Sequence, residues 1–475
     1  MWDNWLFQED QYYLFFLMGL EEGPWNAFGL ATSIDAIHWK YHGPIVKQKH
    51  ADATWMGTGY TWRSPVPGVS KYCLNFSEWF DSPDHPGQQK IYFCESDDLL
   101  HWTHLPDELA STPDPRYYRL NEGGMSRWDT IHELKKPGGG LYGYLTANPK
   151  DILHGPGLVE SEDGIHWRCL PAPEMIWSKR EHAALMHRER GLEIGGIARF
   201  GNRYAMIISD SHFGMGIMWA DKPEGPFTSQ VKNFNFMPAP KGPDKHSPVY
   251  YARFFFSRSG DTFFNIHAIA KPRAHGKEPH PVYTTPLKLA RVDAEGILRA
   301  WWWQGNDLLK HVPLEMRLGP EVVHTGWILQ PISPGYDVRK GVVVEAQFTI
   351  PRPGQKVGLA IKLTNPFDIA SLYEVFFIGS DGSVEIGVID LDEGEVPYDF
   401  EDHVDLEFPL VPDNKIHLLQ RLGFVELYLN DQLLVQWSLA MWPSGEMAWM
   451  ATAPQSPVSL MAWQMDLRDI DRTAY

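Results

Sequence analysis

One seven-residue pattern returns three times along the first part of the chain. SIDAIHW ends at Trp39, SDDLLHW at Trp102 and SEDGIHW at Trp167, at nearly equal intervals. Each copy follows an apolar run typical of a strand, and its acidic residues predict a tight turn into the next strand. Weaker copies, ADKPEGPF and ARVDAEGIL, end at Phe227 and Leu298. Such a repeat indicates an architecture built from similar units side by side.

The segments between the copies are typical of β-strands. Runs such as YYLFFLMGL, GLYGYLTA and TFFNIHAIA are rich in aromatic and apolar residues, and long helical periodicity is scarce. Units of about 60 residues with about four strands each predict the blades of a β-propeller, and five blades fit residues 1–315. A single-sheet barrel is the alternative, but it does not explain the repeat.

The last third of the chain has a different pattern of residues. Nine short runs between residues 336 and 475 alternate apolar and polar residues, as VVVEAQFTI, VEIGVID and FVELYLND illustrate. Short strands at close spacing predict a sandwich of two sheets. The expected fold is therefore all-β, with a five-bladed β-propeller at 1–315, a linker at 316–335 and a β-sandwich at 336–475.

Composition excludes several classes of function. The formal net charge of −18 argues against nucleic acid or an anionic membrane surface as a partner. The three cysteines, Cys73, Cys94 and Cys169, form neither a disulfide framework nor metal-ligand spacing. No phosphate-binding loop, dinucleotide fingerprint or HExxH motif occurs, so we expect no cofactor and no metal. No signal peptide or membrane-spanning run is visible, which predicts a cytoplasmic protein. The sequence leaves a homo-oligomer open.

Three acids stand just ahead of the expected first strand of a blade: Asp3, Asp129 and Glu193. The first strands of all blades begin at one central funnel, so we expect these side chains to meet there. Three carboxylates in one funnel would repel one another, which predicts a raised pKa for at least one of them. Two carboxylates suffice for glycoside hydrolysis, and a third can stabilise the developing charge.

Aromatic residues lie on the same segments as the acids. Indole rings stack on the apolar faces of sugars, so each is a candidate sugar platform, with core packing as the alternative. His246 begins the expected fifth blade, where it could line the funnel or simply cap a strand. These candidates for substrate binding are Trp5, Trp55, Trp62, Trp128 and His246.

The order of these features resembles glycoside hydrolase family 32, the fructofuranosidase or invertase-like group. The opening Asp3-Asn4 followed by the aromatic run 12–16 is similar to the start of that family. The segment 424–439, FVELYLNDQLLVQWSL, is similar to a late segment of its sandwich. Further resemblances lie at 55–59 (WMGTG), at 128–130 (WDT, for the family's Arg-Asp-Pro) and at 193–194 (EI, for its Glu-Cys).

This chain also departs from the family pattern. The family's Asp-Pro-Asn-Gly turn is DNWL here, Trp128 replaces the Arg of Arg-Asp-Pro although Arg127 is adjacent, and Ile194 replaces the Cys. In the family these positions help to recognise fructose. The resemblance adds Asn4, Thr58 and Arg127 to the candidates for substrate binding.

The resemblance implies a role for each acid. Asp3 would be the nucleophile, Asp129 the transition-state stabiliser and Glu193 the general acid/base of a retaining glycosidase. The implied substrate is an oligosaccharide or small glycoside with a furanoside bond, a fructoside being favoured. Two alternatives stay open: an inverting arabinosidase or xylosidase like those of family 43, and a carbohydrate-binding propeller without catalysis.

Overall fold

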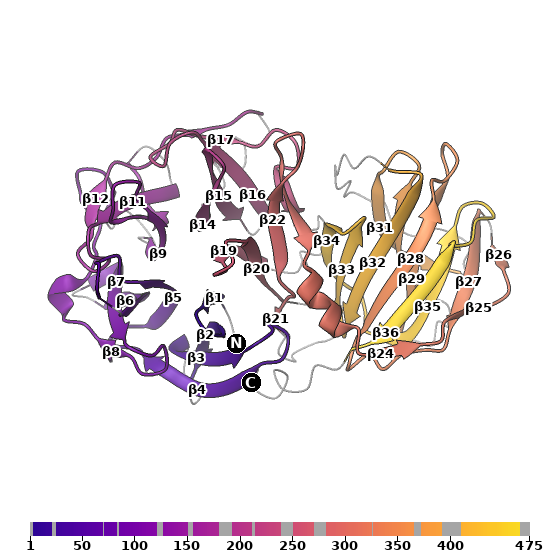
Figure 1. Cartoon of the computed structure of the whole chain (residues 1–475), viewed down its shortest axis with the longest axis horizontal. Helices are drawn as coiled ribbons and strands as arrows, with labels where there is room; N and C mark the ends of the chain where they lie inside the picture. Colours follow the sequence, from indigo (N-terminus) through magenta and orange to yellow (C-terminus); the bar gives the residue numbers. More distant parts are fainter. Residues whose placement is uncertain are drawn as a thin grey trace.

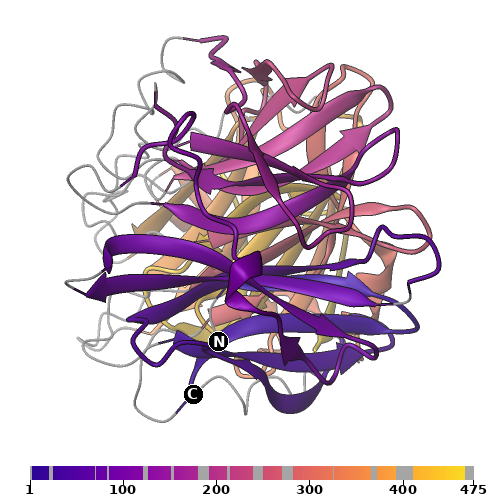
Figure 2. The same cartoon turned by 90° about the vertical axis from the view of Figure 1, so that its left-hand side faces the viewer.

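The computed structural model shows an almost entirely β protein in which strands surround a centre and a second body of strands stands beside them (Figure 1). Figure 2 gives the perpendicular view, in which the first part of the chain faces the viewer. Among the described residues, no helix has the length and apolar character needed to cross a membrane. The structure describes residues 3–20, 25–69, 71–82, 85–120, 127–150, 155–179, 192–210, 214–238, 250–269, 282–324, 326–364, 372–391 and 410–465.

The first three groups of strands are antiparallel sheets of four strands in chain order. Each is a meander in which every strand pairs with the next, so the first strand is at the centre and the fourth at the rim. A short 3-10 helix, η1 (Asp107–Leu109), follows β8. The sheets are β1 (Asn4–Gln8), β2 (Tyr12–Gly19), β3 (Trp25–Ser33) and β4 (Lys40–Lys47); β5 (Trp55–Arg63), β6 (Tyr72–Ser82), β7 (His85–Ser96) and β8 (Thr103–His104); and β9 (Trp128–Lys135), β10 (Leu141–Ala147), β11 (Gly155–Ser161) and β12 (Arg168–Leu170).

Two further groups complete the circle. One sheet has the order β13-β17-β16-β15-β14 with β18 on β16, and the next begins β19-β20-β22-β23 with β21 on β20. The innermost strands contact one another in a closed ring, β1 to β5, β9, β14, β19 and back to β1. The β-propeller is therefore confirmed. Its remaining strands are β13 (Met175–Ile176), β14 (Glu193–Phe200), β15 (Arg203–Asp210), β16 (Gly214–Ala220), β17 (Phe227–Ser229), β18 (Asn235–Pro238), β19 (Tyr250–Phe256), β20 (Thr262–Ile269), β21 (Val282–Thr284), β22 (Lys288–Val292) and β23 (Leu298–Trp302).

The repeated heptapeptide forms the turn between the third and fourth strands of the first three sheets. In the first copy, Asp35 Oδ1 accepts hydrogen bonds from the amides of Ile37 (2.9 Å) and His38 (2.8 Å), and Asp35 Oδ2 lies 2.8 Å from His38 Nδ1. Asp98 and Asp163 repeat these contacts. The acid at the third position thus closes each turn, as the sequence predicts.

The sandwich consists of two sheets that enclose a second core. One continues the propeller sheet beyond β23 in the order β34-β33-β32-β28-β36-β24, and the other has the order β25-β27-β35-β29-β30-β31 with β26 on β27. The sandwich strands are β24 (Val312–Leu314), β25 (Arg317–Leu318), β26 (Val322–His324), β27 (Trp327–Ser333), β28 (Val342–Thr349), β29 (Lys356–Leu363), β30 (Leu372–Gly379), β31 (Val384–Asp390), β32 (Asp413–Arg421), β33 (Phe424–Leu429), β34 (Gln432–Ser438), β35 (Pro443–Ala451) and β36 (Ser459–Gln464).

The segment expected as a linker contributes strands to the sandwich. Within 316–335, β25 and β26 pair with β27, and β27 pairs with β35 along Ile328–Ile332. None of the nine expected runs covers β35, because PSGEMAWMA lacks a clear alternation. Another of the nine, DLEFPLV at 405–411, lies mostly outside the described residues. The domain limits at 315 and 336 stay a prediction.

The propeller and the sandwich are joined through one continuous sheet. β23 meets β34 at the pair Trp301 and Gln432, and the 3-10 helix η3 (Gln304–Leu309) follows β23. Between the sandwich sheets lie alternating aliphatic side chains of β28, β29 and β32, including Val344, Leu359 and Leu418, all fully buried. The propeller and the sandwich thus each have a core, and the sheet that runs through β23 and β34 connects them.

Candidate active site

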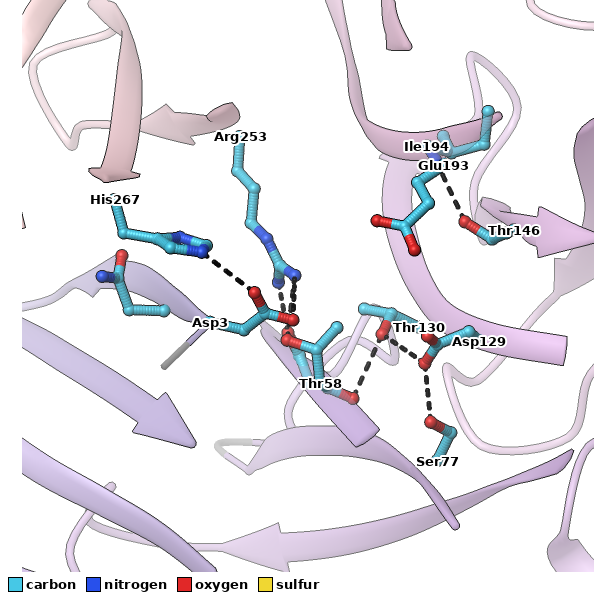
Figure 3. Close-up of polar contacts among 12 residues, drawn as sticks. Asp3, Thr58, Ser77, Asp129, Thr130, Thr146, Glu193, Ile194, Arg253 and His267 are labelled. Atoms are coloured by element: carbon cyan, nitrogen blue, oxygen red, sulfur yellow. Dashed lines mark hydrogen bonds and ion pairs between the residues drawn. The ribbon is translucent and has the colours of Figure 1, made fainter. Parts of the chain in front are cut away.

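One pocket opens at the ends of the innermost strands, and all three candidate acids line it. Asp3 directly precedes β1, Asp129 is the second residue of β9, and Glu193 is the first residue of β14. Figure 3 shows the three carboxylates directed toward a common space. The pocket is lined by Asp3, Thr58, Arg127, Asp129, Thr130, His132, Thr146, Glu193, Ile194, Gly195, Ser209, Tyr251, Ala252 and Arg253.

Asp3 lies against two basic side chains of the last propeller sheet (Figure 3). His267 Nε2, on β20, is 3.0 Å from Asp3 Oδ1, and Arg253 Nη2, on β19, is 4.0 Å from Asp3 Oδ2. Burial opposes ionisation of Asp3, but the hydrogen bond and charge of His267, together with Arg253, outweigh it and lower the pKa of Asp3. The expected repulsion among the acids does not govern the pKa of this carboxyl, because His267 and Arg253 stand beside it.

Arg253 is fixed by backbone and side chain of β5. Its Nη1 donates to the carbonyl oxygen of Gly59 at 2.9 Å, and its Nη2 donates to Thr58 Oγ1 at 2.9 Å. Only 8% of the Arg253 side chain is exposed. A guanidinium held by these two hydrogen bonds cannot reorient freely, so its charge stays beside Asp3.

Asp129 is held by a set of hydroxyl groups. Ser77 Oγ donates to Asp129 Oδ1 at 2.6 Å, and Thr130 Oγ1 lies 3.0 Å from the same oxygen. Gln89 fixes this arrangement from behind, since its Nε2 donates to Ser77 and its Oε1 accepts from the amide of Trp128. The Asp129 carboxylate is therefore oriented by hydrogen bonds and only 13% exposed.

Arg127 joins the other two acids. Its Nη2 lies 3.2 Å from Asp129 Oδ2 and 2.9 Å from Glu193 Oε1, so one nitrogen serves both carboxylates. With 34% of its side chain exposed, Glu193 is the most accessible of the three acids. The amide of the next residue, Ile194, donates to Thr146 Oγ1 at 3.0 Å and holds the start of β14 in place.

The innermost strands are irregular where they pass the pocket. The register of β5 shifts between Met56 and Gly59, that of β9 shifts opposite Tyr144 and Thr146, and that of β14 shifts between Ile194 and Gly196. Each shift is a β-bulge, which redirects side chains and ends regular pairing. In β9 the bulge contains Thr130, a β-branched residue with φ of 49°, a strained conformation for that side chain.

Three of the expected sugar platforms are core residues instead. The rings of Trp5, Trp62 and Trp128 are at most 1% exposed, and the indole nitrogens of Trp5 and Trp128 donate to Thr61 and Ser111. These predictions are wrong, because strand alternation turns the rings into the space between sheets rather than into the pocket.

The remaining candidates have mixed outcomes. Thr58 and Arg127 line the pocket, whereas Trp55 stacks on Trp79 with ring centroids 5.7 Å apart and is not among the lining residues. Asn4 is 1% exposed and bonds Thr284 and Asn265, so it holds the strand behind Asp3 and does not face a ligand. His246 lies outside the described residues.

Sequence reasoning missed the partners of the acids. Arg253 lies in YYARFFF and His267 in FNIHAI, each a basic residue within a largely apolar strand. Such a residue is costly to bury unless it has a partner, which is the signal that could have found both. In the described part of the chain, no three His, Cys, Asp or Glu side chains are grouped as a metal site would require.

These observations define a class of protein: a β-propeller with a carboxylate-lined pocket at its centre, joined to a β-sandwich. The sequence matches no protein-family model and no curated protein. Its likeness to known proteins lies in the fold.

Solved structures of glycoside hydrolase family 32 share this fold over nearly the whole chain. The GH32 beta-fructofuranosidase BmSUC1 of Bombyx mori superimposes with a TM-score of 0.63 at 12% identity, covering 97% of this chain and 90% of that one. The fructan 1-exohydrolase IIa of Cichorium intybus gives 0.64 at 12% identity, covering 97% and 93%. The sucrose-6-phosphate hydrolase of Lactobacillus gasseri gives 0.63 at 14% identity, covering 96% and 88%. The chain thus has a GH32-like fold.

Proposed function

We propose that this protein is a glycoside hydrolase that cleaves a furanoside bond, preferably a fructoside, with retention of configuration. The observation that carries the proposal is the meeting of Asp3, Asp129 and Glu193 in one pocket, from three separate sheets. The fold supports it, because fructoside-cleaving enzymes such as a beta-fructofuranosidase and a fructan exohydrolase share the architecture. A carbohydrate is accordingly the proposed ligand of the pocket.

Asp3 is suited to the role of nucleophile. A nucleophilic carboxylate must be ionised when the substrate arrives, and His267 and Arg253 favour that state of Asp3. Attack of Asp3 on the anomeric carbon forms a glycosyl–enzyme ester as the bond to the leaving oxygen breaks. Water then releases the sugar and regenerates the Asp3 carboxylate.

Glu193 is suited to the role of general acid/base because it is the most exposed of the three acids. It gives a proton to the leaving oxygen in the first step and takes one from water in the second. Arg127 Nη2 lies 2.9 Å from Glu193 Oε1 and orients this carboxyl group in the pocket.

Asp129 is suited to stabilising the transition state. Its carboxylate is held by Ser77, Thr130 and Arg127 and has little freedom to move toward a reacting carbon. A fixed negative group beside the sugar ring stabilises the oxocarbenium-like charge without reorganising during the reaction.

A panel of fructosides, arabinosides and xylosides tests this proposal, with the anomeric form of the released sugar followed by NMR. We expect turnover of a fructoside with retention, and a loss of about 10²–10⁴-fold in kcat for Glu193→Gln. Glu162→Gln, an exposed acid at the rim of the propeller, is the matched control and should leave kcat unchanged.

Other outcomes of the panel point to the alternatives. Inversion at the anomeric carbon, with an arabinoside or xyloside as substrate, would replace the retaining assignment by an inverting one. Sugar binding without turnover by either the wild-type protein or Glu193→Gln would mean a carbohydrate-binding propeller.

A further inference from the structure

His132 is a pocket residue to which the proposed reaction assigns no role. It follows Asp129 by three positions on β9, and in a regular strand two such side chains would point to opposite faces. The β-bulge between them adds one residue, since Asp129 is opposite Thr146 and His132 is opposite Tyr144. Both side chains consequently line the same pocket.

The surroundings of His132 favour its neutral imidazole. Burial, reinforced by the charge of Arg253, holds the pKa of His132 well below its ordinary value, and only 2% of the residue is exposed. The ring hydrogen-bonds the backbone of Ile194, whereas Nδ1 has no partner among the residues that the structure describes. The bond to Ile194 is therefore made by Nε2–H, and Nδ1 carries a free acceptor lone pair.

The neighbours of His132 direct their own polar groups elsewhere. The ring of Tyr60 packs edge-on at 5.0 Å, and its hydroxyl lies 3.5 Å from the carbonyl oxygen of Phe254. Arg253 uses Nη1 and Nη2 on the β5 backbone and on Thr58. These two neighbours therefore offer no donor from those groups to Nδ1, and a buried acceptor is costly to leave without one.

There is room for an atom beside this nitrogen. Gly196 on β14 faces His132, and a Cβ placed on Gly196 would be 3.6 Å from Nδ1 and meet nothing closer. The glycine thus leaves open the position from which a ligand group could approach the lone pair.

We propose that His132 Nδ1 accepts a hydrogen bond from a hydroxyl group of the bound sugar and so determines which sugars the pocket selects. This inference rests on the proposed function. A sugar fits the requirement because it brings hydroxyl donors, and a neutral imidazole accepts from them without competing for the proton of Glu193. An analogue that lacks the hydroxyl would leave the acceptor buried and unpaired, which the site rejects.

Two amide substitutions separate this role from a structural one. The side-chain amide of Gln superimposes on His Nε2, so His132→Gln keeps the bond to Ile194 and loses the Nδ1 acceptor. The amide of Asn superimposes on Nδ1, so His132→Asn keeps an acceptor there and loses the bond to Ile194. Both variants are made in the Glu193→Gln background, and fructose binding is measured by calorimetry. We expect His132→Gln to weaken binding at least tenfold and His132→Asn to change it less than threefold.

A structural role predicts the reverse order, because only His132→Asn breaks the contact with β14. Equal losses in both variants, or a larger loss for His132→Asn, would overturn the inference. A second measurement requires no substitution: the ¹⁵N resonance of His132 Nδ1 should shift on saturation with fructose. An unchanged resonance in a fructose-saturated protein would also overturn it.

Failure of the inference can be told from failure of the proposed function. If the wild-type protein cleaves a fructoside and His132→Gln binds fructose as tightly as its parent, the function stands and the inference is wrong. If neither the wild-type protein nor Glu193→Gln binds fructose and no fructoside is cleaved, both are wrong.

Discussion

Lys288 of β22 and Glu426 of β33 form an ion pair across the junction of propeller and sandwich, with Nζ 2.5 Å from Oε1 and neither side chain exposed. Lys288 also donates to Thr285 Oγ1 and to the carbonyl oxygen of Pro286, and Glu426 accepts from Tyr428 and Gln436. The polar groups of both side chains are thus satisfied, which a buried pair requires. Glu426 lies in the segment 424–439, whose sequence resembles a late segment of family 32.

Removing one member of this pair should destabilise the whole protein. Lys288→Met leaves the Glu426 carboxylate buried without its cation, and we expect the free energy of unfolding to fall by about 3–5 kcal/mol in urea titrations. Lys362→Met breaks the exposed pair with Glu446 and is the control, with a loss below about 1 kcal/mol. The double variant Lys288→Met/Glu426→Gln should recover part of the loss. A single variant as stable as the control would contradict this account.

His267 should set the acid limb of the pH–rate profile through Asp3. His267→Gln keeps a donor near the position of Nε2 but removes the charge, so the pKa of Asp3 rises and a higher pH is needed to ionise it. We expect the acid limb of kcat/KM to move up by about one pH unit or more, within the range of an opposite charge at hydrogen-bond distance. The profile is measured with the best substrate of the panel, and an acid limb that stays in place would mean that Asp3 does not depend on His267.

Replacing Thr130 by glycine should change kcat and leave the free energy of unfolding nearly unchanged. Thr130→Gly relieves the positive φ of 49° but removes the hydroxyl that lies 3.0 Å from Asp129 Oδ1 and 3.1 Å from the carbonyl oxygen of Thr58. We expect the free energy of unfolding to stay within about 1 kcal/mol of the wild type, while kcat falls roughly tenfold. Thr130→Ser retains the hydroxyl and should retain kcat. A Gly variant with full kcat would show that the hydroxyl does not position Asp129.

The repeated turns offer a matched pair of stability tests. The residue after the turn acid has positive φ in all three copies: 61° at Ala36, 65° at Leu99 and 81° at Gly164. Ala36→Gly should therefore raise the free energy of unfolding by about 0.5–1 kcal/mol, since glycine adopts this conformation without strain. Gly164→Ala should lower it by more than that, because the added Cβ would be 2.7 Å from Trp62 Nε1. Thermal unfolding measures both changes, and the same sign for both would contradict the account.

The turn acids should also contribute to stability in a defined range of pH. Partial burial opposes ionisation of Asp35 and Asp163, but hydrogen bonds from the following residues lower the pKa of each to about 2, from an ordinary value of 3.8. A depressed pKa in the folded state gives stability that is present above pH 3.8 and is lost as the pH falls toward 2. We expect Asp35→Asn to reduce the slope of stability against pH in this window. An unchanged slope would mean that the turn contributes equally when protonated.

The amino-acid sequence by itself determined the local features of this protein. The acid of each heptapeptide closes its turn with amides two and three residues away, so the turn needs no distant partner and can be recognised from spacing alone. Aromatic and apolar content likewise predicts the strands β2, β10 and β28, because most residues of each strand are buried. The repeat also predicted the ring of sheets. From that ring it follows that Asp3, Asp129 and Glu193 line one pocket.

Only the tertiary structure decided which groups surround those acids. Arg253 and His267 reach Asp3 from another sheet, and a bulge of one residue turns His132 into the pocket, neither of which leaves a periodic signal in the chain. The same applies to Trp5, Trp62 and Trp128, whose positions beside the acids suggested sugar platforms. Whether an indole faces a ligand or the core depends on the direction of one Cβ, and that direction is set by strand register, which only the packed sheets determine.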